Sequence, residues 1–159
     1  MPHVSFNTTV GFLTLFQDTD ALVAIEWGQA SDDGATPLLD AARQQIDAYF
    51  DGAPIAFDLP VRPVGTAFQR NVWRHLQHIP YGSIETYGDV AAALNTSARA
   101  VGTACGRNPL PIVIPCHRVV GAGHALVGFS GGSGVDTKNA LLCLENAPGF
   151  STVQYALNP

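Results

Sequence analysis

TYGDVAAALNTSARAVGTACG, residues 86–106, predicts two short helices joined by a tight turn. The first helix would begin near residue 86 or 87, Asn95-Thr96 would form the turn, and Ser97 can cap the second helix. Two such helices make a helix-turn-helix, whose second helix usually reads the major groove of DNA. A plain helical hairpin with a solvated Arg99 fits the same pattern, so both interpretations stay open from this stretch alone.

A longer helix would precede this pair. Thr66-Ala67-Phe68-Gln69 is a capping box, and Pro80-Tyr81-Gly82 ends the apolar run that follows it. The second helix of the pair consists largely of alanine and glycine, which gives little to read base edges with but permits close approach to a backbone or a narrow groove. Residues 66–106 therefore predict a mainly helical region.

The chain upstream of this region predicts a small α/β domain. Residues 11–16 and 21–27 read as two short strands, and a helix follows with Thr36 as its N-cap and Pro37 at its first position. Residues 52–65 are rich in proline and glycine, as linkers are. The expected organisation is an α/β domain over residues 1–60, a linker over residues 61–65 and a second domain over residues 66–159.

The composition is typical of a compact soluble protein. Of the 159 residues, 47% are hydrophobic and 13% are charged, which suits one medium domain or two small ones. Residues 1–16 hold no lysine or arginine and no long apolar run, so we expect no signal peptide, no membrane span and a cytoplasmic location. Three widely spaced cysteines predict free thiols, with Cys105 and Cys143 as packing residues in helices.

Charge is distributed unevenly along the chain, whose net charge is −5. Residues 1–60 hold nine acidic residues and one arginine, whereas residues 61–135 hold six arginines and two acidic residues. A polyanion could therefore approach one face while the other face repels it. An ordinary uneven surface explains the same counts, so charge alone leaves the partner open.

The segment around Cys116 carries the strongest chemical signal. The apolar run Ile112-Val113-Ile114 predicts a buried strand that ends in a loop containing Cys116 and His117. Pro115 and the cation of Arg118 indicate a fixed, electropositive site that favours a thiolate. A cysteine that only packs in the core fits the same residues.

Together these features resemble the O6-alkylguanine-DNA alkyltransferase family over residues 65–146. The resemblance rests on the following series in this order: Phe68-Gln69, Tyr87-Gly88, Arg99-Ala100-Val101-Gly102, Gly106-Arg107-Asn108-Pro109, residues 114–120, residues 128–132, and Leu141-Leu142 before Glu145. Residues 1–60 match more loosely. The resemblance implies an α/β N-terminal domain with a small ribonuclease-H-like sheet, and a mainly helical C-terminal domain with a winged-helix-like helix-turn-helix.

The resemblance also implies a reaction. Cys116 would attack the alkyl carbon on O6 of guanine and keep the group as a thioether, so that each protein molecule acts once. His117 would accept the thiol proton through a water molecule, and Glu145 would hold the imidazole. Tyr87 would assist rotation of the nucleotide out of the duplex and protonate the departing guanine.

Five further residues would serve the DNA and the flipped base. Arg99 would occupy the gap in the base stack, and Asn108 would brace the helix-turn-helix against the cysteine loop. Val119, Ser130 and Gly131 would line or hydrogen-bond the base pocket. The implied partner is double-stranded DNA containing O6-alkylguanine, approached from the minor groove by a monomer, with no metal, no cofactor and no membrane.

The sequence departs from the family pattern in two places. The segment from Tyr87 to Arg99 is two residues shorter than usual, and Phe129 stands where many members have tyrosine. Two other classes remain open: a module that binds the lesion without transfer, and a hydrolase in which Cys116 and His117 form an acyl-enzyme and turn over.

Overall fold

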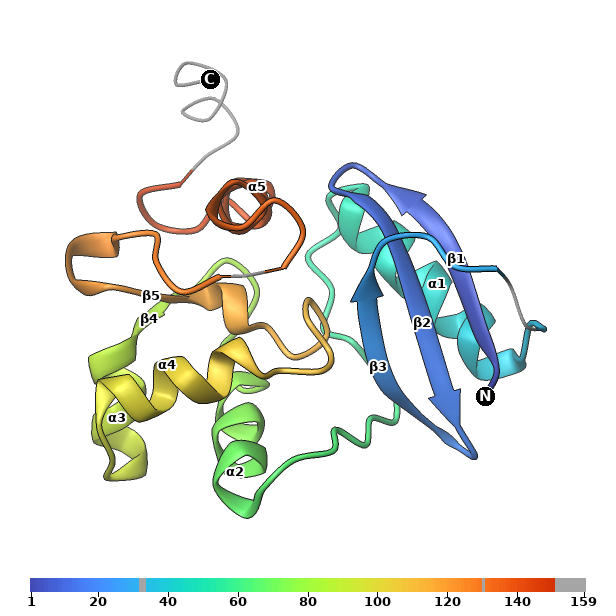
Figure 1. Cartoon of the computed structure of the whole chain (residues 1–159). Helices are drawn as coiled ribbons and strands as arrows, with labels where there is room; N and C mark the ends of the chain where they lie inside the picture. Colours follow the sequence, from blue (N-terminus) through green and yellow to red (C-terminus); the bar gives the residue numbers. More distant parts are fainter. Residues whose placement is uncertain (32–33, 130, 151–159) are drawn as a thin grey trace.

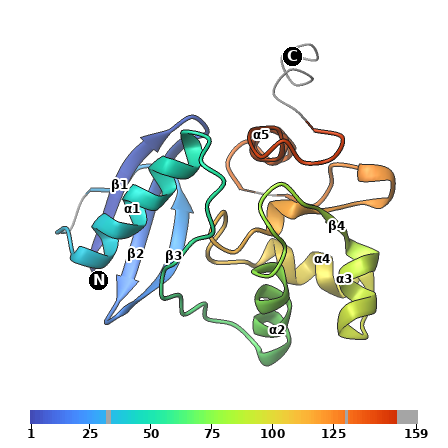
Figure 2. The same cartoon turned by 180° about the vertical axis from the view of Figure 1, so that it is seen from behind.

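The computed structural model describes residues 1–31, 34–129 and 131–150, and it places a small sheet beside a group of helices (Figure 1). The sheet consists of β1 (His3–Thr8), β2 (Gly11–Asp18) and β3 (Ala21–Trp27), antiparallel in the order β1-β2-β3. One face of the sheet is covered by α1 (Pro37–Phe50), as the reverse view shows (Figure 2). The predicted α/β N-terminal part is confirmed.

In this part of the chain the cap of α1 was predicted from the sequence, whereas β1 was not. Thr36 caps α1 as predicted, because the Leu39 N–H donates to its hydroxyl over 3.0 Å. The sequence analysis missed β1, in which only Val4 and Phe6 are buried. Two buried positions are too few for the alternation of a strand to stand out from a loop.

Helices and short turns form the rest of the described chain. They are α2 (Ala67–Leu76), β4 (Glu85–Thr86), α3 (Tyr87–Leu94), α4 (Ala98–Gly106), η1 (Cys116–Arg118), β5 (Val119–Val120), η2 (Ala122–His124) and α5 (Val135–Leu144). The hydroxyls of Thr66, Thr86 and Ser97 cap α2, α3 and α4. Asn95 ends α3 in the left-handed conformation, with φ of 54°. Asparagine tolerates that conformation better than most residues do, so the turn of the helix-turn-helix forms where the sequence predicts it.

The predicted buried strand at residues 112–114 is wrong. Ile112 has a φ of 74°, and the Ile114 N–H donates to the carbonyl of Leu110 over 2.8 Å, so the backbone turns back on itself. Pro111 and Pro115 flank this run and cannot donate to a strand ladder. Cys116 therefore begins a short 3-10 helix, and a two-residue strand, β5, follows the cysteine instead of leading to it.

The two parts of the molecule share one core and are joined along β3. The Leu22 N–H donates to Pro60 O over 2.9 Å, and the Arg62 N–H donates to Leu22 O over 2.8 Å, so the linker lies against this edge strand. A further hydrogen bond between the two parts comes from the Ile25 N–H, which donates to Pro109 O over 2.9 Å. These bonds fix β3 against the loop that leads to Cys116. No described helix combines the length and apolar character that crossing a bilayer would require.

Candidate active site at Cys116

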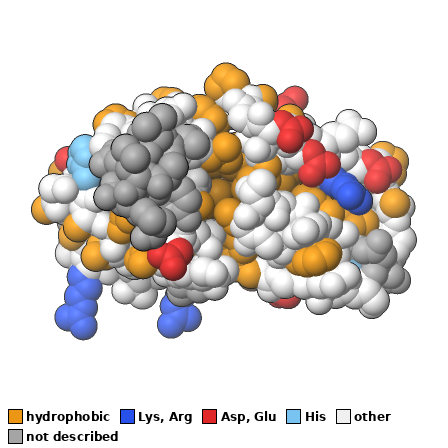
Figure 3. Space-filling model, turned by 90° about the horizontal axis from the view of Figure 1, so that it is seen from above, with side chains coloured by type: hydrophobic (Ala, Val, Ile, Leu, Met, Phe, Trp, Pro, Cys, Tyr) orange, Lys and Arg blue, Asp and Glu red, His pale blue; other side chains and the backbone are white. Residues whose placement is uncertain are grey.

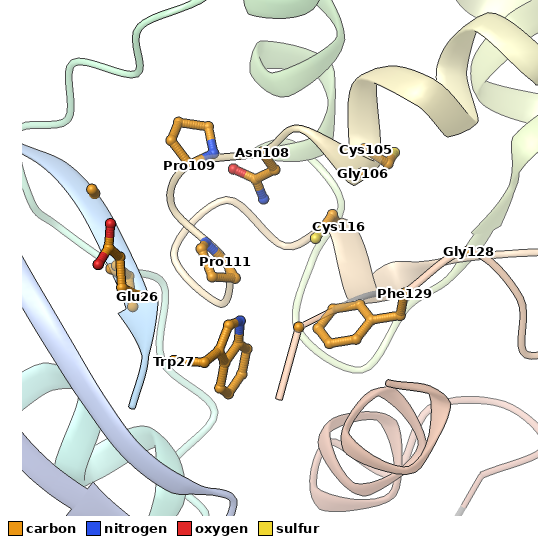
Figure 4. Close-up of a pocket in the computed structure, with 13 residues that line it drawn as sticks. Glu26, Trp27, Cys105, Gly106, Asn108, Pro109, Pro111, Cys116, Gly128 and Phe129 are labelled. Atoms are coloured by element: carbon orange, nitrogen blue, oxygen red, sulfur yellow. The ribbon is translucent and has the colours of Figure 1, made fainter. Parts of the chain in front are cut away.

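Cys116 lies in the wall of a cavity between the sheet and the helices. The cavity has a volume of about 470 Å³, within the range typical of small-molecule sites. Its lining comes from β3, the end of α4, the loop before Cys116 and the segment after residue 127 (Figure 4). The lining residues are Ala24, Ile25, Glu26, Trp27, Cys105, Gly106, Asn108, Pro109, Pro111, Cys116, Gly128, Phe129 and Gly131.

His117 is fully buried beside a carboxylate. Its Nε2 lies 2.6 Å from Oε2 of Glu145, and both side chains have no exposed surface. Since a carboxylate accepts, Nε2 carries the hydrogen and Nδ1 is left as the basic nitrogen. Nδ1 is buried and has no hydrogen-bond partner among the described residues. Burial lowers the pKa of His117 below its ordinary value although the Glu145 carboxylate acts in the opposite direction, so the imidazole rests neutral.

Glu145 is held by donors from three parts of the chain. The Tyr49 hydroxyl of α1 donates to Oε2 over 2.6 Å, and Gly82 N–H donates to Oε1 over 3.1 Å. Arg118 adds Nε at 2.9 Å from Oε1 and Nη2 at 3.1 Å from Oε2. Burial alone would raise the pKa of Glu145, but the hydrogen bonds from His117 and Arg118 and the charge of Arg118 outweigh it and hold that pKa well below its usual range.

The electropositive thiolate expected at Cys116 is not what the structure shows. Arg118 is turned away from the sulfur, because its guanidinium is shared between Glu145 and the carbonyl of Ile79, 2.7 Å from Nη1. Burial raises the pKa of the Cys116 thiol, while the amide of Asn108 and the charge of Lys138 act in the opposite direction. The resting group is therefore a thiol.

A buried lysine, Lys138, which was not predicted as a site residue, donates a hydrogen bond to Tyr87. Lys138, on α5, has no exposed surface, and its Nζ donates to the Tyr87 hydroxyl over 3.3 Å and to Val127 O over 2.8 Å. The Tyr87 hydroxyl in turn donates to Val127 O over 2.9 Å. A signal was available: Lys138 is the chain's one lysine, three residues before Leu141 on the apolar face of its helix. A Cβ at Gly128 would lie 2.6 Å from the Tyr87 oxygen, so only glycine fits there.

Of the remaining predicted site residues, some line the cavity and others do not. Asn108 and Gly131 line the cavity, and the Asn108 side chain bridges the end of α4 to the cysteine loop, donating to Ile114 O over 2.8 Å. Arg99 is exposed at the second position of α4, seven residues from the cavity end of that helix, or about 10 Å along its axis. Val119 is fully buried and is not part of the cavity lining, and Ser130 lies outside the described residues.

Charge separates between the two parts of the molecule. Seen from above, acidic side chains gather over the part that holds the sheet, with a basic side chain among them, while arginine side chains project from the helical part, which also shows acidic side chains (Figure 3). Two of the six arginines in residues 61–135 are engaged elsewhere: Arg62 pairs with Asp20 at 2.5 Å, and Arg118 is buried against Glu145. The exposed arginines on α2, α4 and the following residue are Arg70, Arg74, Arg99 and Arg107.

Comparison with protein families matches both parts of the chain. Residues 67–147 match the DNA binding domain of 6-O-methylguanine DNA methyltransferase, and residues 3–63 match its ribonuclease-like domain. The two matches divide the chain at the Pro- and Gly-rich segment that leads into α2.

Similar proteins and structures cover nearly the whole chain. A methylated-DNA–protein-cysteine methyltransferase of Methanosarcina acetivorans is 36% identical, covering 92% of this chain and 99% of its own. The constitutive methylated-DNA–protein-cysteine methyltransferase of Bacillus subtilis is 38% identical, covering 90% and 94%. The crystal structure of Mycobacterium tuberculosis OGT in complex with DNA superposes with a TM-score of 0.82 at 38% identity, covering 94% of this chain and 95% of that one.

Proposed function

The chain belongs to the 6-O-methylguanine DNA methyltransferase family, and from that premise we propose that it repairs O6-alkylguanine in DNA by moving the alkyl group to Cys116. One observation carries the proposal: Cys116 lines a cavity of about 470 Å³ and precedes His117 of the buried His117–Glu145 pair, whose imidazole has its second nitrogen without a described partner. A thiol, an imidazole that can accept its proton and a space for the alkylated guanine thus lie within one site.

The protonation states of the site favour a coupled attack. A thiol with an ordinary pKa of about 8.5 is ionised to about 3% at pH 7, and burial reduces that fraction at Cys116. We propose that Nδ1 of His117 takes the thiol proton through a water molecule as Sγ attacks the alkyl carbon. The S–C bond forms while the C–O6 bond breaks, and Glu145 stabilises the imidazolium that results.

The leaving guanine requires a proton, and we propose that Tyr87 supplies it. Its hydroxyl already accepts a hydrogen bond from the Lys138 ammonium. That charge would stabilise the phenolate left behind when Tyr87 protonates the base. Because a thioether is not readily hydrolysed, the product remains on the protein and each molecule acts once.

The DNA would be bound by the helix-turn-helix as a duplex. We propose that α4 enters the minor groove, since its exposed small residues allow a close approach to the backbone. The lesion would be rotated out at a cost of roughly a few kcal/mol, with Arg99 filling the gap in the stack. The other three exposed arginines, Arg70, Arg74 and Arg107, would supply phosphate contacts, and one monomer would serve one lesion.

Intact-protein mass spectrometry tests the proposed function. Incubation with duplex DNA containing O6-methylguanine is expected to add one methyl group per protein molecule and then to stop. A protein that binds this DNA but stays unmodified would instead be a lesion-binding module. Repeated turnover of an ester substrate, with no stable mass gain, would favour the hydrolase.

A further inference from the structure

The far wall of the cavity, facing Cys116, is built by the N-terminal part of the chain. Trp27, at the end of β3, points into the space between Pro111 and Phe129 (Figure 4). Its indole lies edge-on to the Phe129 ring, with centroids 6.2 Å apart and planes at 76°. A tryptophan, a phenylalanine and a proline therefore form an aromatic corner within the same space that contains the Cys116 sulfur.

The position of Trp27 is fixed by bonds on both of its sides. Within the sheet, Trp27 pairs with Leu13 of β2, and the Gly28 N–H that follows donates to Phe12 O over 2.8 Å. The Ile25 N–H bonds to Pro109 O of the cavity loop over 2.9 Å. These backbone hydrogen bonds hold the end of β3, which carries the indole, against the cysteine loop.

The glycine segment after Phe129 is packed directly on this indole. A Cβ added at Gly131 would overlap Nε1 and Cε2 of Trp27, and one at Gly132 would lie 3.3 Å from Cε3. Gly131 is therefore needed where it approaches Trp27, whereas Gly132 is restricted by its φ of 53° and by the Thr137 hydroxyl, 2.7 Å from the added Cβ. The contact joins β3 to the segment that closes the cavity.

From this geometry we propose that Trp27 determines which O6 substituents the site accepts, favouring flat aromatic groups such as benzyl. The inference rests on the proposed alkyl transfer. The helix proposed to bind DNA, α4, contributes Cys105 and Gly106 to one side of the cavity, and β3 closes the other side (Figure 4). A base that enters from α4 presents its O6 substituent to Cys116, so a substituent larger than methyl extends toward Pro111 and Trp27. Aromatic contacts of this kind favour a planar group over a methyl group by up to about tenfold.

The test compares two duplexes that differ only in the lesion, O6-methylguanine or O6-benzylguanine. The second-order rate of Cys116 alkylation is measured by mass spectrometry for the wild type, Trp27→Ala and Trp27→Phe. Trp27→Ala is expected to lower the benzyl rate about tenfold more than it lowers the methyl rate, so that the benzyl-to-methyl rate ratio falls. Trp27→Phe, which keeps an aromatic ring, should retain the ratio within about threefold.

A matched control removes another partly exposed aromatic ring from the same sheet. Phe12→Ala, on β2 and outside the cavity, should leave the ratio unchanged. Equal losses on both lesions in Trp27→Ala would overturn the inference and reduce Trp27 to a structural role. A wild type that transfers methyl but not benzyl, or a faster benzyl transfer in Trp27→Ala, would also overturn it. A wild type that transfers neither group would refute the proposed function itself.

Discussion

The carboxylate of Glu145 accepts hydrogen bonds from five donors on four residues, and this single side chain organises the chemistry of the site. The donors belong to Tyr49, Gly82, His117 and Arg118. With the carboxylate saturated, the imidazole of His117 is fixed in one tautomer and Nδ1 is available to accept a proton. The positive charge of Arg118 is thus paired with Glu145, which holds His117, and does not lower the pKa of the Cys116 thiol.

The pH dependence of alkyl transfer follows from these pKa directions. The pKa of His117 is lowered by burial, so the base stays neutral as pH falls through about 6.5, the usual histidine value. The pKa of the Cys116 thiol is raised, so the thiol stays protonated through its usual range near 8.5. Single-turnover rates on methylated DNA are therefore expected to be flat between about pH 6.5 and 8.5.

A His117→Ala variant is the matched control for this profile. Without the base, transfer depends on solvent ionisation of the thiol, so its slower rate should rise about tenfold per pH unit. The same steep rise in the wild type would contradict a resting thiol served by His117.

Lys138 allows a second prediction at this scale. Lys138→Met keeps the length of the buried side chain and removes its charge, so the Tyr87 phenolate would lose its stabiliser. We expect the transfer rate to fall roughly 100-fold, within the range for general acid catalysis. A double-mutant cycle with Tyr87→Phe checks the mechanism, because the two losses should not add if Lys138 acts through the Tyr87 hydroxyl. Additive losses would assign Lys138 another task.

At the scale of elements, local chemistry decides what the sequence can predict. The caps at Thr36, Thr66 and Ser97 were predicted because each bonds to an N–H three residues away. The strand expected at residues 112–114 was wrong because an apolar run does not distinguish a strand from a buried turn. The family resemblance supplied the remaining site residues, whereas Trp27 and Tyr49 depend on contacts across the two parts of the chain, which no local pattern records.

The exposed position of Arg99 on α4 leads to a prediction about flipping. Arg99→Ala should slow repair of O6-methylguanine in duplex DNA by at least tenfold, since the unstacked state loses the side chain that fills its gap. Transfer from free O6-benzylguanine requires no flipping and should change less than twofold. Thr103→Ala, one turn later on the same exposed side of α4, is the control for contact with DNA alone. Equal losses of Arg99→Ala on both substrates would remove the flipping role.

At the scale of the whole molecule, the sheet and α1 form part of the site. Trp27 supplies a cavity wall, and the Tyr49 hydroxyl reaches the Glu145 carboxylate from α1. We expect the acidic N-terminal part to face away from DNA, while its residues Trp27 and Tyr49 contact the site around Cys116. The expected boundaries of residues 1–60, 61–65 and 66–159 stay a prediction, and the cavity around Cys116 is lined by residues from both sides of them.

Removal of the Tyr49 hydroxyl measures how much its hydrogen bond to Glu145 contributes to the free energy of unfolding. Tyr49→Phe removes a buried hydrogen bond to a charged group, which costs about 1.5–3 kcal/mol. For a chain of this size the expected fall in melting temperature is about 4–10 °C in thermal unfolding. Tyr81→Phe, whose hydroxyl donates to the neutral carbonyl of Leu144 over 3.3 Å, should lower it by less than half as much. Equal shifts would mean that the bond to Glu145 has no special value.

The most direct test of the central claim identifies the cysteine that carries the alkyl group. Cys105 and Cys116 line the same cavity, and burial raises the pKa of both thiols. Only Cys116 has the His117–Glu145 pair next to it in the chain. Peptide mapping by tandem mass spectrometry after reaction with O6-methylguanine DNA should find the methyl group on Cys116 alone, and Cys105→Ser should react at the wild-type rate. A methyl group on Cys105, or an unmethylated Cys116 in a protein that has repaired its DNA, would contradict the account.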